Sequence, residues 1–374
     1  MPTVLIVGGY GAFGGRAAER LARDADLEIV IAGRHIDRAA TAAALLTAMP
    51  QVRARISHAA CDARTLTAAD LAAIAPDVVI NASGPFQAQD YTVARAAIEA
   101  RCHYLDLADA RGFVSGISAL DTAARNAGCL VVSGASSVPG LSSAIVRDLA
   151  PRLANITSLD IGISPGNSFD PGLATTQSIL GYVGRPLRML IDGAWQDAYG
   201  WQGTRRHSFP QIGTRWLGHA DVPDLDLFPK RYPTLTTMRF HAGVEVALFH
   251  FGMWLISWGV RAGLVRNPTA LAGPLLSMKR KLAMLGSDRG GMYVALVGTD
   301  HGGCPRRLVF ELEAGSGHGP YIPAMACTIL ARKLCRGELT ATGAMPCFDL
   351  FTLADFDTAV ADLDIRHAVR EETT

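Results

Sequence analysis

Hydrophobic residues in the first 140 positions fall into short runs rich in valine, isoleucine and leucine, and alanine-rich stretches separate these runs. The runs predict six β-strands, at VLIVG (4–8), EIVIAG (28–33), VRARISHAACD (52–62), DVVINASG (77–84), HYLDLA (103–108) and CLVVSGA (129–135). The intervening stretches favour helices, at 15–23, 37–49, 68–75, 91–101 and 113–127. Alternating strands and helices indicate βαβ units, and strands with few polar positions are typical of a sheet covered on both faces. The pattern predicts an α/β fold with a doubly wound parallel sheet, a Rossmann domain.

The pattern becomes less regular after SSVPG (136–140). A helix at 141–149 and a strand at 158–164 are followed by 165–235, which is rich in glycine, proline, tryptophan and arginine and shows no repeat. Later segments predict a helix near 271–285 and a hairpin of the strands 292–298 and 307–314. This mixture predicts a second domain of the mixed α+β type.

The segment PYIPAMACTILARKLCRGEL (320–339) predicts an amphipathic helix, with Pro323 in its first turn and Gly337 near its end. We therefore predict three parts. They are a Rossmann domain over 1–135, an α+β domain for substrate binding or oligomerisation over 136–315, and a C-terminal helix and tail over 316–374 that pack back on the Rossmann domain.

One segment raises the question of a membrane. VALFHFGMWLISWGV (246–260) has fifteen residues, of which only His250 and Ser257 are polar. A spanning helix needs about twenty residues, so this segment is too short. Three interpretations stay open: a buried helix, the wall of a lipophilic substrate pocket, or a contact with a membrane surface.

Charge and cysteine content narrow the class of protein. Lys plus Arg (35) nearly balances Asp plus Glu (34), so no broad electrostatic surface for nucleic acid is expected. The seven cysteines are scattered without a CxxC, which favours reduced thiols in the cytosol, and the ten histidines form no HxxxH pair, so no metal site is predicted. The first predicted strand begins too early to leave room for a signal peptide. We expect a cytoplasmic protein with a small-molecule partner.

The first predicted strand runs into a glycine-rich turn, VLIVGGYGAFGGR (4–16). Gly9, Gly11 and Gly14 satisfy G-x-G-x-x-G between a strand and a helix, the context that supports dinucleotide binding. We assign Gly9 to the tight turn, Gly11 to the approach of a pyrophosphate and Gly14 to close packing of helix on strand. The turn residues between them, Tyr10, Ala12 and Phe13, are included in the predicted cofactor site, because the helix N-terminus supplies free donors there.

The end of the second predicted strand indicates which dinucleotide binds. An NAD site usually has Asp or Glu there, but this chain has Gly33 and Arg34, with Arg38 one helical turn later. Arginine presents a planar fork that suits a phosphate dianion. The sequence therefore predicts NADP(H).

Polar residues follow the later strands, at the edge of the sheet where ligands of such folds bind. Each is a candidate for the cofactor site, although turn chemistry explains Asp, Asn and Ser at strand ends equally well. The candidates of this kind are Asp62, the Asn81, Ser83, Gly84, Pro85 and Phe86 stretch, and Ser136.

The chain resembles the saccharopine dehydrogenase-like, NADP-binding oxidoreductases. The segments that carry the resemblance are GGYGAFG (8–14), AGR (32–34), NASGPF (81–86), HYLDLAD (103–109) and GASSVPGLSS (134–143), and more loosely the C-terminal hairpin and the helix GPYIPAMACTILARKL. The resemblance covers about the first 145 residues, and 165–290 carries little that matches.

The resemblance implies hydride transfer with a nicotinamide. Family members act on C–N bonds of amino acid adducts or, in a mycobacterial branch, reduce an enoyl group on a lipid intermediate. By position, it implies that the cofactor is lined by Gly9, Gly11, Gly14, Arg34, Asp62, Gly84, Pro85 and Phe86. Family enzymes often have Glu shortly after Y-x-D, where this chain has Ala108 and Asp109, and this departure weakens the case for an amino acid substrate.

Reduction of a carbonyl or imine needs a proton donor within hydrogen-bond reach. Tyr104, Asp106, Asp109 and His207 are the catalytic candidates, and an iminium substrate would lower the need for an acid. Arg205, Arg206, His207 and Arg215 are either clamps for a dicarboxylate or a solvated loop. The five tryptophans all lie in the second domain, which suits a bulky, weakly polar substrate and core packing equally.

The sequence thus predicts an NADP(H)-dependent oxidoreductase that transfers hydride to a C=N, C=O or C=C bond of a small, fairly apolar substrate. One alternative is an enoyl reductase that acts on a lipid-like intermediate at a membrane surface. A second alternative is a non-catalytic NADP-binding regulator. A homodimer is a further expectation, because the hairpin of the second domain could pair between subunits.

Overall fold

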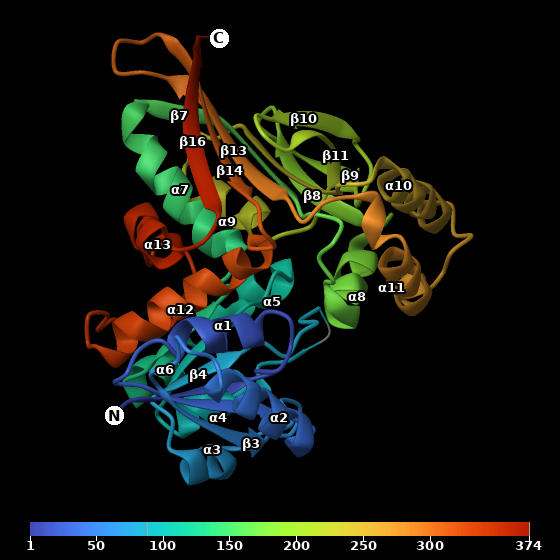
Figure 1. Cartoon of the computed structure of the whole chain (residues 1–374). Helices are drawn as coiled ribbons and strands as arrows, with labels where there is room; N and C mark the ends of the chain where they lie inside the picture. Colours follow the sequence, from blue (N-terminus) through green and yellow to red (C-terminus); the bar gives the residue numbers. More distant parts are fainter. Residues whose placement is uncertain (88, 374) are drawn as a thin grey trace. The chain divides into compact units, whose positions relative to one another are not determined.

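The computed structural model describes residues 1–87 and 89–373. The chain forms two compact units, each built from separate stretches of sequence (Figure 1). Unit 1 is Met1–Leu141 with Tyr321–Phe351, and unit 2 is Ser142–Pro320 with Thr352–Thr374. Each unit has a β-sheet of its own, and no strand in the described part of the chain is shared between the two sheets.

The sheet of unit 1 has seven strands in the order β15-β6-β5-β4-β1-β2-β3, and every neighbouring pair is parallel. The strands are β1 (Thr3–Val7), β2 (Glu28–Gly33), β3 (Arg55–Ala60), β4 (Val78–Asn81), β5 (His103–Asp106), β6 (Leu130–Ser133) and β15 (Gly343–Pro346). The helices are α1 (Gly14–Leu21), α2 (Ile36–Thr47), α3 (Ala68–Ile74), α4 (Thr92–Glu99), α5 (Arg111–Gly116), α6 (Asp121–Ala127) and α12 (Ile322–Cys335). The predicted doubly wound parallel sheet is confirmed.

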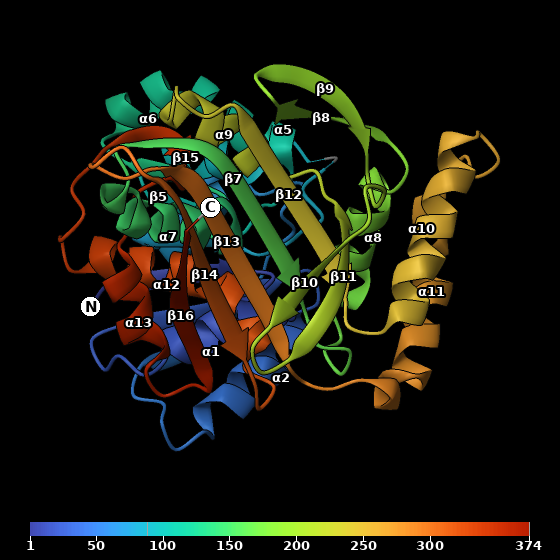
Figure 2. The ribbon, with the colours of Figure 1, turned by 90° about the horizontal axis from the view of Figure 1, so that it is seen from above.

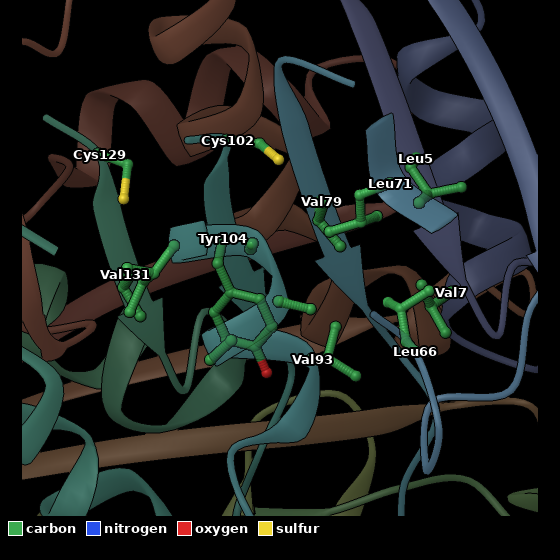
Figure 3. Packing of buried hydrophobic residues seen from close by; sticks show 14 of the residues in the cluster. Leu5, Val7, Leu66, Leu71, Val79, Val93, Cys102, Tyr104, Cys129 and Val131 are labelled. Carbon is green, nitrogen blue, oxygen red and sulfur yellow. The ribbon is translucent and has the colours of Figure 1, made fainter. Parts of the chain in front are cut away.

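Helices cover both faces of this sheet, with α1 and α12 on one face and α3 and α4 on the other (Figure 1). Alternate residues of β1 point to opposite faces, and Val4, Leu5 and Ile6 are all fully buried. Burial on both sides is the reason that this strand is a continuous hydrophobic run rather than an alternating one. Figure 3 shows Leu5 and Val7 in one cluster with Leu71 of α3, and Val79 and Tyr104 in the same cluster.

The predicted helix near the C-terminus is α12, which belongs to unit 1 and packs against α1. The Arg332 guanidinium donates from Nε to the Asp24 carboxylate at 2.6 Å and from Nη2 to the Arg20 carbonyl at 2.5 Å. The Tyr321 hydroxyl donates to Glu19 at 2.7 Å. These contacts join α12 and the residue before it to α1 and the turn that follows it.

Unit 2 is built on a nine-stranded mixed sheet with the order β10-β11-β12-β7-β13-β14-β16, and β8 and β9 extend it from β12 (Figure 2). Its strands are β7 (Asn155–Ser164), β8 (Pro186–Ile191), β9 (Ala194–Tyr199), β10 (Arg205–Phe209), β11 (Gly213–His219), β12 (Thr237–Val244), β13 (Gly290–Thr299), β14 (Pro305–Ala314) and β16 (Ile365–Thr373). Its helices are α7 (Ser142–Leu149), α8 (Gly172–Tyr182), α9 (Asp224–Arg231), α10 (Ala247–Arg261), α11 (Ala272–Lys281) and α13 (Leu353–Val360). Strands β13 and β14 form the predicted hairpin, with ten residue pairs in register from Gly290↔Ala314 to Thr299↔Pro305.

The segment 316–374, which we expected to pack as a whole on the Rossmann domain, is divided between the units. Tyr321–Phe351 belongs to unit 1, whereas Thr352–Thr374 belongs to unit 2. There β16 pairs antiparallel with β14 over nine residues, from Ile365↔Ala314 to Thr373↔Arg306. The hydrophobic pattern did not indicate this strand, because it is rich in charged and partly exposed residues.

Candidate functional site

The glycine turn after β1 is crowded by its own backbone. Gly8 has φ of 83°, in the left-handed region that favours glycine, and its carbonyl accepts from the Gly11 N–H at 2.9 Å. A Cβ on Gly14 would lie 2.4 Å from the same carbonyl oxygen, and a Cβ on Gly8 would lie 2.9 Å from the Ala82 carbonyl carbon. Gly8 and Gly14 are therefore needed for the turn to close between the ends of β1 and β4.

Gly8 is a residue to which the sequence assigned no role. Its N–H donates to the Ala32 carbonyl at 2.8 Å, so Gly8 continues the β1–β2 pairing while its φ starts the turn. By contrast, the nearest atom to a Cβ on Gly11 is the Gly8 oxygen at 3.1 Å, and no other heavy atom comes within 4 Å. Gly11 thus leaves the outer side of the turn open, which is the side that a pyrophosphate would approach.

An aromatic ring lies over the end of β2. A Cβ on Gly33 would lie 2.4 Å from a ring carbon of Tyr10, so only glycine allows the ring this position. The His35 N–H donates to the Tyr10 hydroxyl at 3.3 Å, and the Arg38 guanidinium lies 4.8 Å from the ring centre. Arg34 is exposed beside this cluster. Tyr10 therefore contacts Arg38, and Arg34 follows Gly33 directly, at the edge of the sheet where the cofactor ribose is expected.

The end of β3 adds a paired carboxylate. Asp62 accepts from Arg64 at 3.1 Å and 2.6 Å, and the hydrogen bond from Arg64, with a further contribution from Arg34, lowers the pKa of Asp62 to about 2. The Asp62 carboxylate is paired with Arg64, whereas Arg34 and Arg38 bring two further positive side chains to the segment that follows β2. This charge suits the 2′-phosphate of NADP(H).

The loop after β4 is held by hydrogen bonds of its own. Asn81 is 1% exposed, accepts from the Ser83 N–H at 3.1 Å and donates to the Tyr104 hydroxyl at 3.3 Å. Gln89 donates to the carbonyls of Ser83 and Pro85 at 2.9 Å and 3.0 Å. Phe86 is buried against Phe113, with ring centres 5.3 Å apart. The loop is thus fixed at the carboxyl end of β4, next to the glycine turn.

Two of the predicted catalytic residues are interior side chains. Asp106 is fully buried, and its Oδ1 accepts from the Gly134 N–H, the Ser133 hydroxyl and the Ala108 N–H at 2.8, 2.9 and 3.0 Å. Burial raises the pKa of Asp106 to about 6, against the lowering effect of these donors. Burial also raises the pKa of Tyr104 well above its usual range. Through these hydrogen bonds, Tyr104 and Asp106 hold the ends of β4, β5 and β6 together.

Asp109 and Ser136 lie in the segments that follow β5 and β6. Asp109 is partly exposed and accepts a long hydrogen bond from Gln87 at 3.5 Å. Ser136 is 8% exposed, and its N–H donates to the Gly134 carbonyl at 2.7 Å. Asp109 is therefore the more accessible acid at this end of β5.

His207, the fourth catalytic candidate, belongs to unit 2, on β10. Its Nε2 lies 2.7 Å from the Glu311 carboxylate, and its ring stacks on Tyr293 with centres 3.9 Å apart. Burial lowers the pKa of His207. This imidazole is held rigidly inside unit 2.

The predicted basic clamp in unit 2 is engaged in internal contacts. Arg205 is paired with Asp160, and Arg215 is paired with Glu245 at 3.2 Å. Arg206 lies over the ring of Trp216 at 5.2 Å. All three arginine side chains therefore interact with other residues of unit 2.

All other predicted site residues lie at the carboxyl edge of the unit 1 sheet. They follow β1 (Gly9, Tyr10, Gly11, Ala12, Phe13, Gly14), β2 (Gly33, Arg34, Arg38), β3 (Asp62), β4 (Asn81, Ser83, Gly84, Pro85, Phe86), β5 (Tyr104, Asp106, Asp109) and β6 (Ser136). Strand β1 lies between β2 and β4, where the strand order reverses and where ligands bind in doubly wound folds.

Residues 1–87 and 89–373 contain neither a candidate metal site nor a candidate membrane span. No group of three or more His, Cys, Asp or Glu side chains there is placed to hold a metal ion. No helix in that part of the chain is long and apolar enough to cross a bilayer.

Residues 4–132 match the family described as the saccharopine dehydrogenase NADP binding domain. Among solved structures, the chain is similar to apo saccharopine dehydrogenase (L-Glu forming) from Saccharomyces cerevisiae, with 12% identity, a TM-score of 0.68, and coverage of 99% of this chain and 100% of that one. It is also similar to amine dehydrogenase from Mycobacterium smegmatis, with 10% identity, a TM-score of 0.51, and coverage of 93% and 94%. No curated protein sequence matches at a significant level.

At these identities the two structures share the fold with this chain, and the family match adds the cofactor. The expected resemblance and the expected NADP(H) cofactor are confirmed. Residues 4–132 thus form a dinucleotide-binding domain that is similar to the NADP-binding domain of saccharopine dehydrogenase.

Proposed function

We propose that this chain is an NADP(H)-dependent oxidoreductase that transfers hydride to a C=N, C=O or C=C bond of a small, fairly apolar substrate. When bound, the nicotinamide supplies the hydride. The residues of the chain position the dinucleotide at the carboxyl edge of the unit 1 sheet.

The arginine pair at the end of β2 carries the proposal. Arg34 and Arg38 stand where an NAD site usually has a carboxylate, and Tyr10 stacks with Arg38. The nearby Asp62 carboxylate is paired with Arg64. A 2′-phosphate would meet net positive charge there, whereas the hydroxyl of NAD(H) would leave Arg34 without an anionic partner.

Substitution of Arg34 by Asp tests this assignment. We expect wild-type protein to bind NADPH at least tenfold more tightly than NADH, because a charge-assisted hydrogen bond contributes roughly 1.5–3 kcal/mol. Arg34→Asp should raise the Kd for NADPH tenfold to hundredfold and leave the Kd for NADH within about threefold, measured by fluorescence titration.

A matched control is Arg53→Asp, which reverses the charge of an exposed arginine just before β3, at the opposite end of that strand. It should leave both affinities unchanged. Equal affinity of the wild-type protein for NADPH and NADH would overturn the role given to Arg34.

The internal pairing of the basic residues in unit 2 supports a substrate of low charge. A dicarboxylate substrate would need several free cations that converge on it, and Arg205 and Arg215 are paired with Asp160 and Glu245. A panel of imines, ketones and enones with NADPH tests the reaction class by loss of NADPH absorbance. Oxidation with at least one apolar member supports the proposal, and tight NADPH binding without turnover of any member favours a non-catalytic NADP-binding protein.

A further inference from the structure

Helix α10 of unit 2 has its polar side chains inside and its apolar side chains outside. His250 and Ser257 are fully buried, although they are the polar residues of its apolar run. The Ser257 hydroxyl donates to the Trp254 carbonyl at 2.7 Å, and the His250 carbonyl accepts from the Trp201 indole at 3.1 Å. Burial lowers the pKa of His250 to about 4. The helix packs on β11 and β12 through this polar side.

The outward face of α10 is a continuous apolar row. Leu248, Phe251, Leu255 and Trp258 follow one another at intervals of three or four residues, which places them on one helix face. Their exposed fractions are 67%, 38%, 65% and 43%. The row continues beyond the helix at Leu264, which is 83% exposed. Single exposed apolar residues are ordinary, but an aligned row of this length marks an interaction surface.

Positive charge follows this row along the chain. Residues 247–289 contain one acidic residue, Asp288, and six basic ones, which are Arg261, Arg266, Lys279, Arg280, Lys281 and Arg289. Some of these are engaged within unit 2, since Arg280 pairs with Asp170 at 2.8 Å and Lys279 donates to the Asn167 carbonyl at 2.7 Å. Figures 1 and 2 both place α10 and α11 at the same edge of unit 2.

We propose that the outward face of α10, with the basic residues of 261–289, is a docking surface for an anionic lipid bilayer. Leucine, phenylalanine and tryptophan side chains insert at the level of the headgroups, and Lys and Arg beside them attract anionic lipid. With fifteen residues the helix is about 22 Å long, which is shorter than the hydrocarbon core. The contact is therefore made along the surface of the bilayer and does not span it.

The positive charge of this surface argues against a second copy of the chain as its binding partner. A symmetric dimer through this face would bring the same basic segment of both copies together, so like charges would oppose one another. An anionic bilayer meets the same residues with opposite charge. The proposal concerns a surface of unit 2 and holds whether or not the proposed reaction is correct.

Flotation of the full-length protein with vesicles tests the proposal. The vesicles are phosphatidylcholine alone, or phosphatidylcholine with about a third phosphatidylglycerol. We expect binding to the anionic vesicles at low salt and weaker binding at high salt, because salt screens the charges. L248S/L255S should lower the partition coefficient at least tenfold, since burial of each leucine contributes roughly 1.5–3 kcal/mol.

Charge reversal and a matched control separate the two contributions. R266E/K281E should lower partition into anionic vesicles more than tenfold, at about 1 kcal/mol or a factor of five for each cation removed, and further through the added negative charge. Leu45→Ser changes another leucine that is 64% exposed, on α2 of unit 1, and should have no effect. All three variants alter exposed residues, and urea unfolding followed by circular dichroism confirms that each remains folded.

Two results would overturn the proposal. One is an absence of binding to anionic vesicles at low salt, or equal binding by L248S/L255S. The other is a dimer in sedimentation velocity that L248S/L255S converts to a monomer without any vesicle binding, which would make this face an interface between copies.

Discussion

At the residue scale, the glycine turn depends on contacts between its own glycines. Gly14 lies against the Gly8 carbonyl, and Gly8 itself needs a left-handed φ of 83°. The G-x-G-x-x-G spacing predicts that Gly9, Gly11 and Gly14 form the turn, and in the structure they lie between β1 and the first turn of α1. It could not show that Gly8 is needed, because the reason is the approach of Ala82 from β4, which is distant in the sequence.

Gly14→Ala tests this crowding. The added methyl would lie 2.4 Å from the Gly8 oxygen, so we expect a loss of roughly 1–3 kcal/mol in the free energy of unfolding and at least tenfold weaker NADPH binding. Gly15→Ala is the matched control, because its methyl meets no atom closer than 3.5 Å. Alanine is also the better helix former there, so the control should be neutral or up to about 1 kcal/mol more stable. Equal loss in both variants would contradict the packing argument.

Asp106 predicts a pH dependence of stability. Its pKa is raised from 3.8 to about 6 in the folded protein, so the folded state holds this proton more tightly than the unfolded state. The stabilisation from the protonated form is complete below about pH 4 and is lost as the pH rises through about 6. A rise of about 2 pKa units corresponds to roughly 3 kcal/mol.

Asp106→Asn should remove this contribution, because the amide cannot ionise and its oxygen can still accept from Gly134 and Ala108. Between pH 4 and pH 8, the free energy of unfolding of the variant should rise relative to wild type by roughly 3 kcal/mol, measured by urea denaturation. Parallel pH profiles for the two proteins would show that Asp106 does not carry a raised pKa.

At the element scale, the strands that the sequence predicted with the sharpest bounds are β1 and β2, which are buried on both faces. Both were predicted to within a residue or two because every position after the first, Thr3 in β1 and Glu28 in β2, is apolar or glycine. β15, with the sequence GAMP, is too short to show a period, and β16 is an edge strand with many charged residues. Their positions are fixed by pairing with β6 and β14, and a local sequence pattern does not indicate pairing between distant segments.

The charged residues of β16 predict a measurable contribution to unit 2. Arg370 makes two hydrogen bonds to Glu311, at 2.8 Å and 3.1 Å, and Glu311 is only 2% exposed. Arg370→Ala would leave this carboxylate with the His207 imidazole as its hydrogen-bond partner, so we expect a loss of roughly 2 kcal/mol in the free energy of unfolding.

Arg366→Ala is the matched control on the same strand. The Arg366 side chain is 77% exposed and lies 3.8 Å from Asp364, so its loss should cost less than about 0.5 kcal/mol. Urea unfolding of both variants provides the comparison. A loss in Arg366→Ala as large as in Arg370→Ala would show that strand pairing, and not the buried carboxylate, is what the substitutions disturb.

At the scale of the whole molecule, the sequence predicted the Rossmann fold and the cofactor, because both depend on local patterns near the N-terminus. It did not predict the architecture of 165–235, where β8 to β11 are short or partly exposed strands whose partners are distant in the chain. The catalytic candidates show the same limit. Tyr104 and Asp106 have suitable chemistry, but only the three-dimensional structure shows that both are interior residues.

The division into two units leads to a prediction about cofactor binding. The two sheets share no strand among residues 1–87 and 89–373, so we expect the units to open separately in native-state hydrogen exchange. NADPH at about a hundred times its Kd should stabilise unit 1 by roughly 2.7 kcal/mol.

Exchange of the slowest amides in β1 and β4 should therefore slow by about a hundredfold, whereas those in β13 and β14 should change by less than about threefold. Gly14→Ala at the same NADPH concentration should show a smaller effect in β1 and β4, because it binds the cofactor more weakly. Equal slowing in both sheets would mean that the chain opens as one cooperative body, and the cofactor would then stabilise unit 2 through unit 1.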